Sequence, residues 1–142
     1  VLPKLREPRF LGDMPHAWVS SDYIRSALDL FAYERERDDA LVVGAGLKPE
    51  WLTRGDIRVR RLSTAYGERD LLFTRTGRGW TLSTPRAMNG LRGGVRLVWP
   101  TAMPRPRALH EGRELAWSTD GELRLPDGPA TIELQTQGEN KP

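Results

Sequence analysis

Cysteine is absent from the 142 residues, and histidine is nearly so, with only His16 and His110. The lack of cysteine excludes disulfide bonds, thiolate nucleophiles and cysteine-ligated zinc sites. The two histidines lie far apart in the sequence and do not indicate a histidine-based metal site. No apolar run approaches the roughly 20 residues that a membrane-spanning helix needs. We therefore expect no metal, no other cofactor and no membrane partner.

Lysine is scarce as well, since only three of the 22 basic side chains are Lys, against 19 acidic side chains and a net charge of +3. A nucleic-acid-binding protein gathers its basic side chains on one face. Here only Arg58, Arg60 and Arg61 lie close together, and acidic residues are interspersed almost everywhere else. This pattern is typical of a mixed, solvated surface. No nucleic-acid partner is expected.

The ends of the sequence indicate its context. It begins Val1-Leu2-Pro3, without an initiator Met and without the pattern of a secretory signal peptide. We therefore expect a processed product or a segment of a longer chain. Residues 138–142 are predicted to be a flexible tail.

One amphipathic helix is predicted, over residues 21–37. Ser20 or Ser21 can cap its N-terminus, and Asp22 falls in the first turn, where a carboxylate favours the positive end of the helix dipole. Apolar side chains recur at a spacing of three and four residues and form one stripe. Tyr23 and Leu30 widen this stripe, so we expect the helix to be buried on more than one side. The members of the stripe are Ile24, Ala27, Leu28, Phe31 and Ala32. The charged residues 34–39 are expected to be solvated and to end the helix.

From residue 40 onward the periodicity changes to two, which is typical of strands. Turn signals such as Asn89-Gly90 and Asp120-Gly121 separate short alternating segments and favour hairpins. The expected strands cover residues 40–45, 57–62, 70–76, 79–84, 94–99, 108–110, 113–118, 122–125 and 130–135. Residues 49–52 are expected to form one helical turn. The predicted fold class is mainly β: an antiparallel β-sandwich of about eight strands preceded by one amphipathic α-helix.

Five tryptophans invite a carbohydrate-binding interpretation, because flat aromatic faces stack on sugar rings. Three of them, Trp80, Trp99 and Trp117, fall within predicted strands and are expected to fill the core. Trp51 is expected to anchor the short helical turn.

Trp18 differs from the other tryptophans, because it lies in a polar segment before the expected helix. Together with Asp13, His16 and Asp22 it can line a ligand pocket. Alternatively, His16 is satisfied locally and Trp18 packs on the helix, and the residues alone leave both interpretations open.

No motif of a known catalytic machinery is evident. Asp13 and Asp22 are candidates for a glycosidase carboxylate pair, which needs a separation of about 5–10 Å, but their spacing in the sequence fixes no distance. The glycine-rich residues 90–94 precede a strand and not a helix, so they do not form a phosphate loop. There is no nucleophile elbow and no recognisable Ser-His-Asp triad.

Several short segments nevertheless resemble one group of proteins. The segments FLGDMPHAWV (residues 10–19), SDYIRS (21–26) and FAYE (31–34) are similar to the end of the catalytic region in certain large bacterial glycoside-hydrolase-like proteins. These are often described as discoidin- or coagulation factor 5/8-domain proteins and are related to (α/α)6-barrel enzymes such as α-L-rhamnosidases. In rhamnosidases a similar His-x-Trp precedes a helix late in the barrel, and a β-sandwich domain then closes the chain.

The later segments follow the same order. LVVGAG (residues 41–46) with PEWL (49–52) is similar to the start of that sandwich. EGR (111–113), GELRLP (121–126) and PATIEL (129–134) are similar to its closing strands.

The resemblance implies three segments: residues 1–39 as the loop and last helix of an (α/α)6 barrel, 40–137 as a C-terminal β-sandwich domain, and 138–142 as the tail. It implies a non-catalytic accessory domain that packs against and stabilises the upstream barrel, with a glycan as a candidate ligand. By analogy, His16 and Trp18 face the sugar site, and Asp13 and Asp22 are further substrate-binding candidates. The general acid and base of the family lie upstream, so no catalytic residue is carried over. A secreted or periplasmic location is likewise implied by the resemblance.

Two alternatives stay open. An autonomous carbohydrate-binding module needs at least two coplanar aromatic side chains on one open face. A stand-alone glycoside hydrolase would use Asp13, Asp22 and His16. Without the barrel, the apolar stripe of the helix is expected to find its cover on the sandwich, on a second copy through self-association, or on a partner chain.

Overall fold

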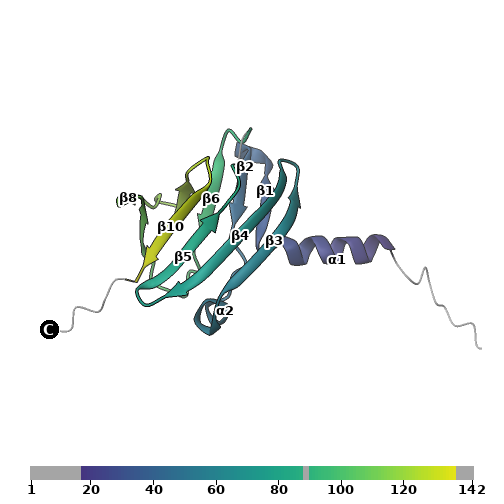
Figure 1. The fold of residues 1–142 in the computed structure, drawn as a ribbon. Coiled ribbons are helices and arrows are strands. Elements are labelled where there is room, and N and C mark those ends of the chain that lie inside the picture. Colours follow the sequence, from purple (N-terminus) through teal and green to yellow (C-terminus); the bar gives the residue numbers. More distant parts are fainter. Residues whose placement is uncertain (1–16, 88–89, 137–142) are drawn as a thin grey trace, which may run out of the picture.

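The structure, a computed structural model, describes residues 17–87 and 90–136 and contains one helix followed by two stacked β-sheets (Figure 1). The helix is α1 (Ala17–Asp29). The first sheet has the strand order β1 (Ala32–Arg35), β2 (Ala40–Val43), β6 (Gly94–Val98) and β9 (Glu122–Leu125). The second has the order β3 (Ile57–Thr64), β4 (Gly67–Thr76), β5 (Gly79–Thr84), β10 (Ala130–Gln135), β7 (Arg107–His110) and β8 (Arg113–Leu115). The predicted fold class, a mainly β sandwich preceded by a helix, is confirmed.

Two short helical segments complete the described chain. A 3-10 turn, η1 (Glu36–Asp38), joins β1 to β2. The helix α2 (Pro49–Arg54) lies between β2 and β3 and confirms the predicted helical turn. Pro49 stands in its first turn, where the fixed φ of proline suits a helix and its missing N–H costs nothing.

The hydrophobic core lies between the two sheets. In β10, buried Ala130, Ile132 and Leu134 alternate with exposed Thr131 and Glu133, as expected for a strand with one face on a core. The largest fully buried side chains are aliphatic and come from both sheets and from α2. They include Leu41, Leu52, Leu71, Leu82, Leu97, Leu123 and Ile132.

Two tryptophans belong to this core, as predicted. The rings of Trp80 and Trp99 are buried and meet edge to face, with centroids 5.2 Å apart. The indole N–H of Trp80 donates to the carbonyl of Leu52 at 2.9 Å, and that of Trp99 to the carbonyl of Pro104 at 3.1 Å. Both polar atoms are therefore satisfied inside the protein. Trp51 and Trp117 are only partly buried and pack at the margin of the core.

One strand pair departs from the predicted antiparallel arrangement. β2 and β6 are parallel, with Ala40 opposite Gly94 and Val43 opposite Leu97. The expectation of a wholly antiparallel sandwich is therefore wrong at this pair. Parallel neighbours cannot be joined by a hairpin, and here the connection contains α2 and the three strands β3, β4 and β5 of the other sheet.

The helix prediction is wrong at both ends. α1 begins at Ala17, so Ser20 and Ser21 lie within the helix and Asp22 follows its first turn. It ends at Asp29, and the next segment is the strand β1, which pairs antiparallel with β2. The first sheet therefore starts before residue 40. Pairing with a buried strand outweighs the helical spacing of this segment, because strand formation depends strongly on tertiary neighbours.

The charged residues after α1 are not uniformly solvated. The side chain of Arg35 is only 12% exposed and forms a bidentate interaction with Glu122 of β9, whose side chain is 18% exposed. Because β1 and β9 are opposite edges of this sheet, the guanidinium crosses the face of β2 and β6 that looks away from the core. The expectation of a solvated charged tail is therefore wrong for Arg35.

The edge strand β3 is irregular. Its register with β4 shifts between Val59 and Leu62 at a β-bulge, and Arg61 in the bulge has a positive φ of 55°. The turn after β3 reaches the first sheet: the Ala65 N–H donates to Glu34 at 2.5 Å. β1 and the end of β3 therefore lie together at one side of the sandwich.

Candidate functional site

Of the four residues predicted to bind substrate, two can be placed. Asp13 and His16 lie outside the described residues. Trp18 and Asp22 are one helical turn apart on α1, and both are exposed, Trp18 to 66%. Residues at this spacing share one face of a helix. The structure thus brings Trp18 and Asp22 to the same side of α1, and their role in binding stays a prediction.

The most unusual feature of α1 is its exposed apolar face, formed by Tyr23, Ile24 and Leu28. Their exposed fractions are 77%, 58% and 38%, and α1 has no buried residue. The helix projects away from the sandwich (Figure 1). Its other side carries Trp18, Asp22 and the ion pair between Arg25 and Asp29 at 3.0 Å. An amphipathic helix with its apolar face in solvent marks a surface for interaction.

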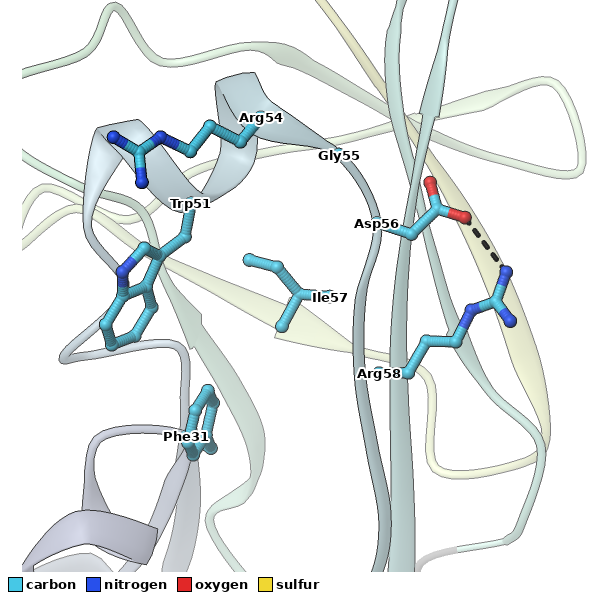
Figure 2. A pocket seen from close by; sticks show the side chains of 7 residues that line it. All are labelled: Phe31, Trp51, Arg54, Gly55, Asp56, Ile57 and Arg58. Atoms are coloured by element: carbon cyan, nitrogen blue, oxygen red, sulfur yellow. Dashed lines mark hydrogen bonds and ion pairs between the residues drawn. The ribbon is translucent and has the colours of Figure 1, made fainter.

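A groove lies next to the point where α1 joins the sandwich. Its apolar walls are Phe31, directly before β1, Trp51 on α2, and Ile57 at the start of β3 (Figure 2). The rings of Phe31 and Trp51 are stacked, with centroids 5.9 Å apart and planes at 23°. The groove has a volume of about 450 Å³. It opens on the side of the sandwich where the edge strands of the two sheets meet.

The rim of the groove is charged. Arg54 on α2, Asp56 and Arg58 also line it, and Figure 2 shows the paired side chains of Asp56 and Arg58 pointing away from Phe31 and Trp51. Asp56 accepts a hydrogen bond from the Arg75 backbone N–H at 3.0 Å and one from Arg58 at 3.0 Å. These two bonds, the backbone one first, lower the pKa of Asp56. The carboxylate is therefore ionised, and it already accepts hydrogen bonds from Arg75 and Arg58.

Two other cations near the groove, Arg54 and Lys48, make no ion pair among the described residues. Within the described part of the chain, the Arg54 guanidinium makes no side-chain hydrogen bond and no ion pair. The ammonium of Lys48 stands 6.0 Å from the centroid of the Trp51 ring, within the range of a cation–π interaction. The groove thus combines apolar walls with a rim of excess positive charge.

Apolar walls with a few charged groups are typical of a binding site. The lining residues include no Ser, His or Cys that could act as a nucleophile, and Asp56 is held in its ionised form by hydrogen bonds. Among the described residues no cluster of His, Cys, Asp or Glu could hold a metal ion. No helix in residues 17–87 or 90–136 is long and apolar enough to span a membrane.

Comparison with known proteins finds no matching family model, no matching curated protein and no matching solved structure. The relationship to (α/α)6-barrel proteins therefore stays a prediction from short sequence segments.

Sequence reasoning did not identify the groove. The pattern predicts Phe31 in the helical stripe and Trp51 as an anchor of the short turn, so nothing in it joins these two residues to Ile57. The one sequence feature that indicates the groove is Trp51, because a tryptophan in a short turn beside charged residues is seldom fully buried in the core.

Proposed function

We propose that this chain is a non-catalytic accessory β-sandwich domain that packs against a larger unit through the apolar face of α1. One observation carries the proposal: α1 holds Tyr23, Ile24 and Leu28 in solvent while the sandwich behind it has a complete core of its own. Burying apolar surface is worth about 25 cal/mol per Å². The exposed face therefore favours any partner with a matching apolar surface.

The size of this face supports a contact within one chain or one stable assembly. A helix of 13 residues is about 20 Å long and about 10 Å wide. A stable complex between separate proteins buries about 800 Å² on each partner, which is more than one side of α1 offers. Two units held together covalently need less surface, because linkage raises their effective concentration.

The partner that the sequence suggests is an upstream (α/α)6 barrel of a secreted or periplasmic glycoside-hydrolase-like protein. This part of the proposal rests on the resemblance of residues 10–34. A barrel of helices would offer ridges and grooves into which the side chains of α1 can pack.

A carbohydrate-binding module is the second candidate, favoured by the aromatic walls of the groove. Two aromatic rings line an open site, as such a module requires. However, Phe31 and Trp51 stack on each other, and Lys48 stands over the Trp51 ring. The two rings therefore do not form a coplanar platform, which makes this candidate the weaker one. A stand-alone hydrolase, which would need Asp13 and His16 with Asp22, is the third.

The experiment that tests the accessory role is a screen of the folded chain for glycan binding and hydrolysis, including rhamnosides. We expect neither activity. Turnover would refute the proposal and support the hydrolase. Binding that Trp51→Ala abolishes would support the carbohydrate-binding module.

A second measurement tests the docking role of α1. Amide hydrogen exchange across residues 17–29 is compared between this chain alone and the chain joined to the upstream barrel. We expect fast exchange in the first case and strong protection in the second. Equal exchange in both would show that α1 does not pack on the barrel.

A further inference from the structure

The groove is a second, separate surface beside the apolar face of α1, and its chemistry indicates what it takes. Phe31, Trp51 and Ile57 are each only partly buried, although all three are large apolar residues. The space between them, about 450 Å³, lies within the range of sites that enclose small apolar groups. An apolar side chain of a partner would complete the burial of all three.

The rim adds a charge requirement. Arg54 lines the groove on the α2 side and the Lys48 ammonium stands over the Trp51 ring, whereas Arg58 on the β3 side is paired with Asp56 at 3.0 Å. Arg54 has its full set of donors available within the described structure. A guanidinium binds a carboxylate through two parallel hydrogen bonds. The complementary group is therefore an acidic side chain next to the apolar one.

A sugar ring fits this site less well than a peptide side chain. Sugar recognition by aromatic residues needs an open ring face. In the groove, Phe31 takes one side of the Trp51 ring and Lys48 lies over it as well. An aliphatic or aromatic side chain needs only the apolar edges and the cleft between the walls, which remain open in Figure 2.

The groove lies close to α1 along the chain, since Phe31 in its wall follows Asp29, the last residue of the helix, by two positions. One partner can therefore contact both the apolar face of α1 and the groove.

We infer that the groove receives an acidic peptide segment of the docking partner, in which an apolar anchor side chain is flanked by Asp or Glu. This inference rests on the proposed docking function and adds the chemistry of the partner. The anchor enters between Phe31, Trp51 and Ile57. The flanking carboxylate binds Arg54.

The indole N–H of Trp51 gives a direct readout. In the described structure it donates to no acceptor, unlike those of Trp80, Trp99 and Trp117, so its NMR resonance reports on the groove. The Trp51→Phe variant assigns this resonance. Three capped helical peptides of equal length serve as probes: one with Leu anchors and Glu flanks, one with Leu and Lys, and one with Ala and Glu.

We expect the Leu/Glu peptide to shift the Trp51 resonance and to bind at least tenfold more tightly than either of the other two. The variant Arg54→Glu should remove this preference and favour the Leu/Lys peptide. Arg113→Glu on β8, the far edge of the second sheet, is the matched control and should change nothing. Circular dichroism verifies that each variant is folded.

The inference is overturned if the Leu/Glu and Leu/Lys peptides bind equally, if none shifts the Trp51 resonance, or if a neutral glycan shifts it and the peptides do not. If the peptide experiment fails while the barrel still protects the α1 amides from exchange, the acidic segment is refuted and the docking function stands. If the barrel does not protect these amides, the docking function itself is refuted.

Discussion

Replacing Glu122 with Gln should lower the free energy of unfolding by about 1–3 kcal/mol, which is the usual value of hydrogen bonds to a charged group. The Arg35 and Glu122 side chains are 12% and 18% exposed, and two contacts join them, one with an Nη2–Oε2 distance of 3.0 Å. Gln keeps the shape and one acceptor but removes the charge. Arg35 also retains Asp38 at 2.7 Å, so the loss should stay below the 3–5 kcal/mol of a fully orphaned buried charge.

The assay is urea unfolding followed by tryptophan fluorescence and by circular dichroism, with Glu114→Gln as the control. Glu114 pairs with Arg107 at a similar distance of 2.9 Å, but these side chains are 57% and 52% exposed. Exposed pairs contribute about 0–1 kcal/mol. The reasoning fails if both variants lose the same stability.

A pH series provides an independent check. The hydrogen bond from Arg35 is the main cause that holds the pKa of Glu122 below its ordinary value. A lowered pKa stabilises the folded state above the unfolded-state pKa, about 4.3 for Glu. The advantage of the wild type over Glu122→Gln should therefore be complete above about pH 5. It should shrink as the pH falls below 4 and through the folded-state pKa, and an advantage that grows in acid would contradict this account.

Four further substitutions, one of them a control, test other parts of the structure. Leu28→Asp should change the unfolding free energy by less than about 0.5 kcal/mol, because Leu28 is exposed on α1. The same variant should reduce any self-association measured by light scattering. A loss of stability above about 2 kcal/mol would instead show that Leu28 packs in the core. Gly46→Ala should cost about 1–3 kcal/mol and speed amide exchange at the α1–β1 junction, because its Cβ would come within 2.7 Å of the Leu30 Cα. Gly77→Ala, whose Cβ would meet no atom within 4 Å, should be nearly neutral. Leu82→Ala in the core should cost about 2–5 kcal/mol in the same urea assay, and a loss under about 1 kcal/mol would contradict the packing described.

The sequence predicted the strands best where the pattern was local. The strands Gly79–Thr84, Glu122–Leu125 and Ala130–Gln135 have the predicted bounds, because apolar and polar residues alternate within each and turn residues flank them. β1 was missed, since Ala32–Arg35 continues the spacing of the helical stripe and becomes a strand only by pairing with β2. The parallel pairing of β2 with β6 joins segments far apart in the chain, so no local pattern contains it.

The candidate site was harder to predict for a related reason. The walls of the groove come from three segments, and Phe31 reaches it only because the helix ends at Asp29. Because the predicted helix extends a few residues too far, the sequence does not predict that Phe31 forms one wall of the groove. The burial of Trp80 and Trp99 was predictable, because each lies in or directly beside a strand with a clear alternating pattern.

The bulge in β3 has a consequence for how copies of this protein meet at high concentration. An unpaired edge strand is a template for strand addition and aggregation, which bulges and charged side chains oppose. β3 combines both, because exposed Arg58, Arg60 and Arg61 lie at the edge that an incoming strand would occupy. The arginine cluster thus opposes strand addition at this edge of the second sheet.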